Sequence, residues 1–261
     1  MQRVRGSASV HIGPRGLIDL AQAGSAKAML PRTDGPVPEV VFLNTAGGVT
    51  GGDVLDYALT IESGTSLVGT TQTAERVYRS VGGRADVSVN LTVGAGAHLD
   101  WLPQETIAYD GAAFGRRTAV ALGQGATFLS VDTIVLGRAA MGEVVRSLDL
   151  DDLRQIRVTS GPVHEERLCL TDAVLADPAA LAGRTALSTL VLIRPDAADR
   201  LDDVRGVLPT FAGASAWDGR LVARFAHHDV VQLRRAVIRA IVALRGTPMP
   251  RVWQAEREAN A

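Results

Sequence analysis

The chain has 261 residues, 46% of them hydrophobic, a formal net charge of −1 and a single cysteine, Cys169. This composition supports a folded core, and it lacks the clustered basic excess of a nucleic-acid-binding protein. One cysteine excludes a disulfide framework and a thiolate metal cluster. The N-terminus has no signal-peptide pattern and no apolar run is long enough to span a bilayer, so we expect a cytoplasmic protein that binds neither membrane nor nucleic acid.

Alternating apolar residues predict β-strands over most of the first two thirds of the chain, for example at 55–61 and 85–93. Three segments, 61–67, 93–99 and 122–128, repeat an apolar residue, a turn with glycine and a second apolar residue. Glycine supplies the positive φ of a tight turn, so we interpret these segments as hairpin tips that recur at intervals of about 30 residues. The recurrence indicates either a layered sandwich or a helical-β stack.

The last third of the chain combines hairpins with helices. Ser160-Gly161 and Asp218-Gly219 predict two more hairpins. From Val230 to Leu244 the apolar residues follow helical spacing, with Asp229 placed as the N-cap and Gly246 as the stop. One or two shorter helices are expected, one of them at 199–208. The predicted fold is therefore mainly β, with a C-terminal helix, in a single domain over 1–261.

The most conspicuous motif is the glycine-rich run from Asn44 to Asp53, which contains Gly47, Gly48, Gly51 and Gly52. Such a run can cradle phosphate through its backbone amides. This one has no Gly-Lys-Ser/Thr ending and precedes a strand instead of a helix. A tight turn, with Asp53 accepting hydrogen bonds from local amides, is the favoured interpretation.

Catalytic motifs are not found. The five histidines have no metalloprotease spacing, and no nucleophile elbow is present. An enzyme that used Asp53 and Glu105 as an acid–base pair is one alternative, although neither has a sequence neighbour that would tune it. We expect no catalytic residue and no stably bound cofactor.

Five carboxylates lie beside turns or strand ends in otherwise apolar or glycine-rich segments: Asp53, Glu105, Asp110, Asp132 and Glu143. Taken singly, each is a solvated turn residue or a cap. If several converge in the fold, they form a hard-oxygen site for a divalent cation, or a series of weak sites along which a cation passes. Periodicity does not decide between these possibilities.

Four strings together resemble the urease accessory protein UreD (UreH) family. They are Asn44-x-x-Gly47-Gly48-x-x-Gly51-Gly52-Asp53, Thr71-Gln72-Thr73-x-x-x-Val77-Tyr78-Arg79, Trp101-Leu102-Pro103-Gln104-Glu105-Thr106-Ile107 and Gly137-Arg138-x-x-Met141-Gly142-Glu143. The resemblance continues to the Pro250-Arg251-Val252-Trp253 tail. This sequence departs from the family pattern at Thr45-Ala46, where two prolines are common, and at Val131-Asp132.

The resemblance implies a helical-β fold and a non-catalytic role in urease maturation. Members of the family bind the urease apoprotein and UreF, which brings UreG, and they are thought to offer nickel an internal route. The five carboxylates named above become a proposed transient nickel path. Arg79 and Arg138 either contact partner carboxylates or lock strand ends. The alternative is a β scaffold that holds the activation complex together and has no role in metal transit.

Overall fold

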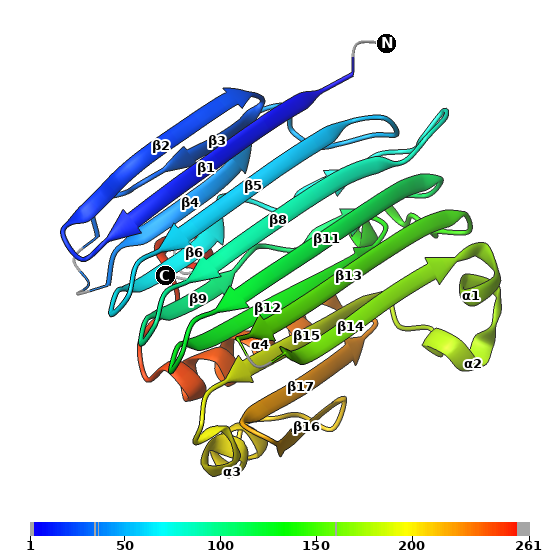
Figure 1. Ribbon diagram of the computed structural model, residues 1–261. Helices are drawn as coiled ribbons and strands as arrows, with labels where there is room; N and C mark the ends of the chain where they lie inside the picture. The colour runs from blue at the N-terminus through cyan, green and yellow to red at the C-terminus, as the bar shows by residue number, and fades with distance from the viewer. Residues whose placement is uncertain (1–2, 34, 36, 160, 255–261) are drawn as a thin grey trace.

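The chain forms two β-sheets that lie face to face (Figure 1), in a computed structural model that describes residues 3–33, 35, 37–159 and 161–254. The front sheet has seven strands, which are β14 (Gly161–Thr171), β13 (Leu148–Val158), β11 (Ala112–Leu122), β8 (Ala85–Val93), β5 (Val54–Ile61), β1 (Arg5–Gly13) and β2 (Gly16–Gly24) in spatial order. The prediction of a mainly β protein is confirmed.

The back sheet has ten strands. Along its main path they are β16 (Ala212–Trp217), β17 (Arg220–His227), β15 (Ala186–Ile193), β12 (Thr127–Leu136), β9 (His98–Leu102), β6 (Ser66–Thr71), β4 (Glu39–Asn44) and β3 (Ala26–Met29), while β10 (Thr106–Ala108) joins β12 to β7 (Glu75–Val77). The described helices are α1 (Asp172–Ala176), α2 (Pro178–Leu181), α3 (Leu201–Arg205) and α4 (Val230–Arg245), with 3₁₀ turns η1 (Ala139–Met141), η2 (Ala197–Arg200) and η3 (Arg251–Trp253).

The central part of the chain winds as a coil that places successive strands in alternate sheets. β5, β8, β11 and β13 run parallel in the front sheet, and β4, β6, β9 and β12 run parallel in the back sheet. The register keeps equivalent positions of successive coils side by side, as with Leu67, Leu99 and Phe128. This confirms the helical-β alternative of the predicted fold.

The three glycine turns are not hairpin tips, as the sequence had suggested. Each joins a front strand to a back strand, β5 to β6, β8 to β9 and β11 to β12, and each of these strands pairs with the next coil instead of its own sequence neighbour. The residue pattern fixes the backbone shape of a turn, but not which strands hydrogen-bond across it. We call the side of the molecule that carries these turns, at 62–65, 94–97 and 123–126, the corner edge.

Glycines at the corner edge have two separate roles. A Cβ on Gly94 would lie 2.4 Å from the backbone N of Ser63, so close packing of neighbouring coils excludes a side chain there. Gly96 has a φ of 64° and open space around it, so only its left-handed backbone requires glycine. The backbone N–H of Gly96 donates to the carbonyl of Gln124 in the next corner at 2.9 Å. Gly94 is therefore required by the close packing of neighbouring coils, and Gly96 by the shape of the turn.

The opposite side of the molecule carries the longer loops that lead into the front strands. These loops, at 45–53, 78–84, 109–111 and 137–147, define what we call the loop edge. Backbone hydrogen bonds stack them, since Gly52 N donates to Arg84 O at 2.8 Å and Gly111 N donates to Ser147 O at 2.7 Å. Much of the four family strings lies here or in the short strands β7 and β10 beside it.

The predicted C-terminal elements are present. β16 and β17 form an antiparallel hairpin with Asp218 and Gly219 both at positive φ, and β13 and β14 form another, although Ser160 at its tip is outside the described residues. α4 begins after Asp229, whose side chain accepts from the amides of Val231 and Gln232, and ends before Gly246 with its φ of 67°. Among the described residues, no helix is long and apolar enough to cross a membrane.

Two apolar cores hold the layers together. One lies between the sheets and includes Leu59, Leu91 and Phe128. The other lies on the outer face of the back sheet, where α4 packs Leu233 and Ile241 against the sheet (Figure 1). The inter-sheet core becomes polar near β7 and β10, close to the loop edge, and the candidate site lies there.

Gly96 gives a direct test of the left-handed turn conformation at the corner edge. We expect Gly96→Ala to lower the free energy of unfolding by about 1 kcal/mol, because alanine at a φ of 64° is strained although its Cβ meets nothing. Gly213→Ala is the matched control, since Gly213 also has open space around it and is not left-handed. Urea unfolding of both variants measures the difference, and equal losses would contradict the interpretation.

Candidate functional site: a polar cavity between the sheets

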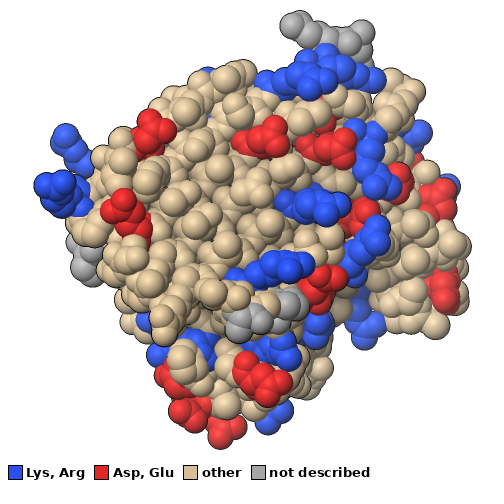
Figure 2. Space-filling view, viewed as in Figure 1, with Lys and Arg blue, Asp and Glu red and all other residues tan. Residues whose placement is uncertain are grey.

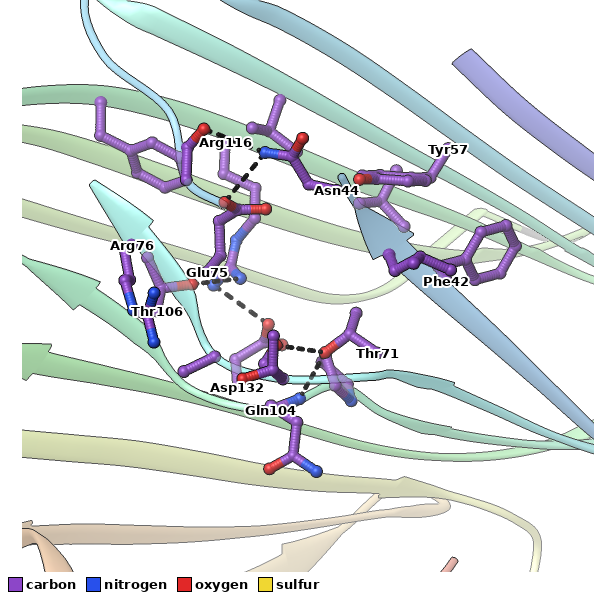
Figure 3. A pocket seen from close by; sticks show the side chains of 18 of the residues that line it. Phe42, Asn44, Tyr57, Thr71, Glu75, Arg76, Gln104, Thr106, Arg116 and Asp132 are labelled. Carbon is purple, nitrogen blue, oxygen red and sulfur yellow. Dashed lines mark hydrogen bonds and ion pairs between the residues drawn. The ribbon is translucent and has the colours of Figure 1, made fainter. Parts of the chain in front are cut away.

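A cavity of about 90 Å³ lies between the two sheets beside the loop edge (Figure 3). Aromatic rings of Phe42, Tyr57, Trp101 and Phe114 form much of its wall. Its polar lining includes Asn44, Thr71, Glu75, Gln104, Thr106, Arg116 and Asp132. A cavity of this size and polarity has room for several water molecules.

Glu75 is the carboxylate nearest the loop-edge side of the cavity. The amide nitrogen of Asn44 donates to its Oε1 at 3.2 Å and to the carbonyl of Gly48 at 3.1 Å. Burial raises the pKa of Glu75 to about 7, with the hydrogen bond from Asn44 opposing the rise. Burial also raises the pKa of Tyr57, and the Glu75 charge adds to that rise. Glu75 therefore exchanges its proton near neutral pH.

The inner end of the cavity is an ion cluster centred on Arg116 of β11. Its guanidinium donates to both oxygens of Asp152, at 2.9 and 2.7 Å, and lies 3.1 Å from Asp132. It also donates to the hydroxyl of Thr106 at 3.3 Å. Asp152 is fully buried and Asp132 nearly so. Pairing of this kind offsets the cost of burying the two carboxylates.

The two aspartates of the cluster differ in their protonation. Burial raises the pKa of Asp132, although Arg116 and Arg154 oppose the rise. Burial also acts to raise the pKa of Asp152, but the attraction and hydrogen bonds of Arg116 outweigh it, so the pKa of Asp152 is lowered. Asp132 is thus the less firmly ionised member of the pair.

The polar chain continues past Asp132 to an open groove of about 530 Å³ on the far side of the cluster. Asp132 lines both the cavity and this groove, and Arg154 and Glu166 line the groove with it. Glu166 Oε2 lies 3.7 Å from Arg154 and 3.6 Å from His164. Burial acts to raise the pKa of Glu166, but the adjacent His164 ring and the charges of Arg154 and Arg224 hold this pKa at about 2.

Of the five carboxylates predicted from the sequence, Asp132 is the one that lines the cavity. Asp53 is buried at the start of β5, where its two oxygens accept from the amides of Val4 and Thr50, both at 2.8 Å. This is the turn-stabilising geometry that the glycine-rich run had suggested. It leaves Asp53 committed to backbone groups, and no side-chain cation lies among its hydrogen-bond partners in the described structure.

Glu105 lies on the α4 side of the back sheet and pairs with Arg234 of that helix. The guanidinium of Arg234 also lies 4.3 Å above the ring of Trp253. The side-chain amide of Gln104 donates to the carbonyl of Val252 at 3.1 Å. Glu105 therefore helps to bind α4 and the C-terminal tail to the sheet. Asp53 and Glu105 are engaged in separate places, which disfavours the acid–base enzyme.

Asp110 and Glu143 are brought together on the loop edge. Asp110 accepts from the amides of Arg146 and Ser147 at 2.8 and 3.0 Å, and these hydrogen bonds lower its pKa. Glu143 accepts from the amide of Asp110 at 3.2 Å and from Arg138, whose hydrogen bond lowers the pKa of Glu143. Among the residues that the structure describes, no group of three or more His, Cys, Asp or Glu side chains could hold a metal ion.

The motif residues shape the loop edge and the cavity. Gly48 is required because a Cβ there would lie 2.4 Å from the ring of Tyr78, whose hydroxyl donates to the carbonyl of Gly47 at 3.2 Å. Gly51, Gly52 and Gly137 lie in the same stacked loops. The hydroxyl of Thr71 accepts from the backbone amide of Gln104 at 2.9 Å, next to the exposed Gln72.

Both motif arginines have local ion pairs. Arg79 lies 2.5 Å from Asp110, and Arg138 lies 2.7 Å from Glu143. These contacts match the interpretation in which the arginines lock strand ends. Both side chains nevertheless stay largely exposed, so pairing within the chain leaves part of each guanidinium at the surface.

The sequence pattern did not single out Glu75, Arg116 or Asp152. Glu75 occupies an unassigned position of the Thr71–Arg79 string and lies in a strand of three residues, too short to show a period. Arg116 and Asp152 do give a sequence signal. Buried and more exposed residues alternate along β11 and β13, and each of these charged residues lies within such a strand. A charge at such a position indicates a buried pair once the strands are known to be neighbours.

The raised pKa of Glu75 predicts a specific pH dependence. An acid whose pKa is higher in the folded state destabilises the fold as pH rises past its unfolded value, near 4.5, with the full cost reached above about 7. We expect the stability of the wild type relative to Glu75→Gln to fall by about 2 kcal/mol between pH 5 and pH 8. Urea unfolding of both proteins at the two pH values measures this difference. A difference that does not change with pH would contradict the assignment.

The ion cluster predicts a large effect of one substitution. Arg116→Met leaves Asp132 and Asp152 buried without their main partner and should cost about 3–5 kcal/mol of stability. Arg167→Met removes an exposed pair with Asp151 and should change stability little. Adding Asp152→Asn to Arg116→Met should recover part of the loss in urea unfolding, and no recovery would show that the two residues are not coupled.

Comparisons with known proteins identify the family. The chain matches the model of the UreD urease accessory protein family over residues 4–254. It is 52% identical over 260 residues to "Urease accessory protein UreD" of Paracoccus denitrificans (strain Pd 1222), covering 97% of this chain and 93% of the relative. It is 41% identical over 257 residues to the protein of that name from Azorhizobium caulinodans, covering 96% and 95%. These findings confirm the resemblance seen in the four strings, and the chain belongs to the UreD family of urease accessory proteins.

Proposed function

We propose that this chain is a non-catalytic urease maturation factor that binds apo-urease and UreF and provides an internal route for nickel to the urease active site. UreG joins the complex through UreF. Nickel is cargo in transit and not a resident cofactor, and the complex assembles in the cytoplasm. Membership of a urease accessory family supports the maturation role.

The observation that carries the transit proposal is the polar cavity inside an otherwise apolar inter-sheet core. Its carboxylates, Glu75 and Asp132, offer hard oxygen ligands, which bind a nickel dication more weakly than thiolates do. Asp132 also lines the groove with Glu166, so a carboxylate lies where the cavity and the groove come closest. Thiolates would trap nickel, and the single cysteine, Cys169, lies exposed on another face.

The other predicted path residues take different parts in this proposal. Asp110 and Glu143 lie together on the loop edge, outside the lining of the cavity. Asp53 accepts a hydrogen bond from Thr50 in the loop edge, and Glu105 binds α4 through Arg234. We keep all five in the proposal, with Asp132 lining the path and the other four holding the loops and the helix around it.

UreF is expected to dock on α4. The buried face of this helix packs on the back sheet, while Val231, Val242, Arg235 and Arg239 lie on its outer side or at its margins. An amphipathic helix fixed on a sheet offers a rigid face to a partner. Glu105 and Trp253 fasten the helix from below through Arg234, so they support this surface indirectly.

The alternative is a β scaffold that assembles the activation complex and plays no part in metal transit. The loop edge and α4 would serve that role without the cavity. A scaffold needs its surfaces and not its interior carboxylates, so the two functions predict different results for interior substitutions that preserve the fold.

Co-expression with the urease subunits, UreF and UreG tests both. We expect urease made without this chain to contain far less nickel, measured by mass spectrometry of the purified enzyme, and equal nickel contents would exclude a maturation role.

Glu75→Gln keeps the shape of the side chain and its contact with Asn44. It should leave complex assembly intact and lower the nickel content, whereas Glu62→Gln, on the exposed corner edge, should change neither. Full nickel loading with Glu75→Gln would favour the scaffold.

A further inference from the structure

Exposed apolar side chains concentrate on the loop edge. Val81, Met141 and Val144 are 78%, 73% and 65% exposed, the three highest values among the large apolar residues that the structure describes. They come from two loops, 78–84 and 137–147, that lie far apart in sequence. Large apolar side chains exposed on one side of a protein among polar ones are typical of an interaction site.

Aromatic and arginine side chains connect these loops into one surface. The ring of Tyr78 packs edge-on against Tyr109 at 5.2 Å, and the guanidinium of Arg138 lies 4.4 Å above the ring of Tyr109. Tyr78 itself is 40% exposed. Tyrosine, methionine and arginine are the residues enriched at the centres of protein interfaces. The mutual packing holds them in place before any partner arrives, which reduces the entropy lost on binding.

The same edge carries an excess of positive charge. Arg79, Arg138 and Arg146 are exposed there, and Arg76 is exposed on β7 beside it. The carboxylates of Asp110 and Glu143 are already engaged by Arg79, Arg138 and backbone amides. In Figure 2, charged side chains gather toward the side of the front sheet where its strands begin, and the rest of that face is largely uncharged. A partner with an acidic surface is electrostatically complementary to this edge.

The surface adjoins the opening of the cavity. The hydroxyl of Tyr78 donates to the carbonyl of Gly47, and Gly47 lines the cavity together with Thr73 and Arg76, all three of which are exposed. A protein seated on Tyr78 and its neighbours would therefore cover that opening. The other candidate surface, α4, lies on the far side of the back sheet (Figure 1).

We propose that the loop edge is a docking surface for a protein partner with an acidic contact face that offers apolar sockets to Val81 and Met141, and that this partner is apo-urease. The assignment to apo-urease rests on the proposed function, because the protein that receives a cation must face the opening through which the cation leaves. UreF then occupies α4, and the chain bridges the two partners by opposite surfaces.

The edge strand β2 supplies a matched control. Leu17 and Ile18 are 49% and 53% exposed, so they resemble Val81 and Met141 in apolar character and exposure. They lie on the outermost strand of the front sheet, away from the cavity. If general surface hydrophobicity held the complex together, substitutions at β2 would weaken it as much as substitutions on the loop edge.

The test uses the affinity-tagged chain co-expressed with UreF and the urease subunits without added nickel. We expect Val81→Asp/Met141→Asp to lower the urease retained on the tag about tenfold, equivalent to 1.4 kcal/mol, while UreF is retained as in the wild type. Leu17→Asp/Ile18→Asp should retain both partners. Arg146→Glu, which reverses one exposed charge, should also weaken urease retention, and salt should weaken retention by the wild type.

Each other outcome is decisive. Urease retention by Val81→Asp/Met141→Asp equal to that of the wild type overturns the docking proposal and leaves the maturation role in place. A wild-type chain that retains no urease contradicts the proposed function itself. If the double variant loses UreF as well, it has lost its fold, and Arg146→Glu decides: unchanged urease retention with that variant overturns the proposal.

Discussion

The parallel backbone pairing between successive coils is the constraint on which the rest of the molecule depends. It places residues about 30 positions apart side by side, so that Val49 bridges to Val77 and Thr106 lies between Glu75 and Ile134. The cavity is lined by residues at neighbouring positions of successive coils, which this stacking brings together between the two sheets. The loop edge exists because the same register aligns the loops that precede β5, β8, β11 and β13. Cavity and surface are therefore two consequences of one repeat.

Local chemistry was sufficient to predict much of this fold. The left-handed glycine of each corner, the Asp229 cap and the Asp218-Gly219 hairpin are decided within a few residues, and each is where the sequence places it. Strand pairing is different, because the hydrogen bonds of Ile61 and Val93 go to neighbouring coils. A turn with the chemistry of a hairpin thus became a corner. The clue lay in Gly94 and Gly123, whose missing side chains report a neighbour that approaches from another coil.

The site was predicted less completely, for a related reason. Asp132 was placed in the candidate path as one of five carboxylates in apolar or glycine-rich segments. It lies within β12 instead of at a strand end, and it does line the cavity. Asp53 and Glu105 gave similar signals yet serve a turn and a helix contact, since a buried carboxylate is equally well satisfied by backbone amides or by an arginine. Glu75 gave almost no signal, because β7 has three residues and no readable period. Burial and partner identity, which decide the role of a carboxylate, are tertiary properties.

The distribution of charge inside the cavity bears on how a cation would be held there under the proposed function. Asp152 is neutralised by the two-point contact of Arg116, so it offers a dication little. Glu75 is held by the neutral amide of Asn44, and burial keeps its pKa near 7. A cation arriving at Glu75 would displace a proton instead of an arginine, and the energy of that exchange is small in either direction at neutral pH. Under the proposed function, Glu75 would be one oxygen ligand that a passing cation exchanges for a proton, as a transit site requires.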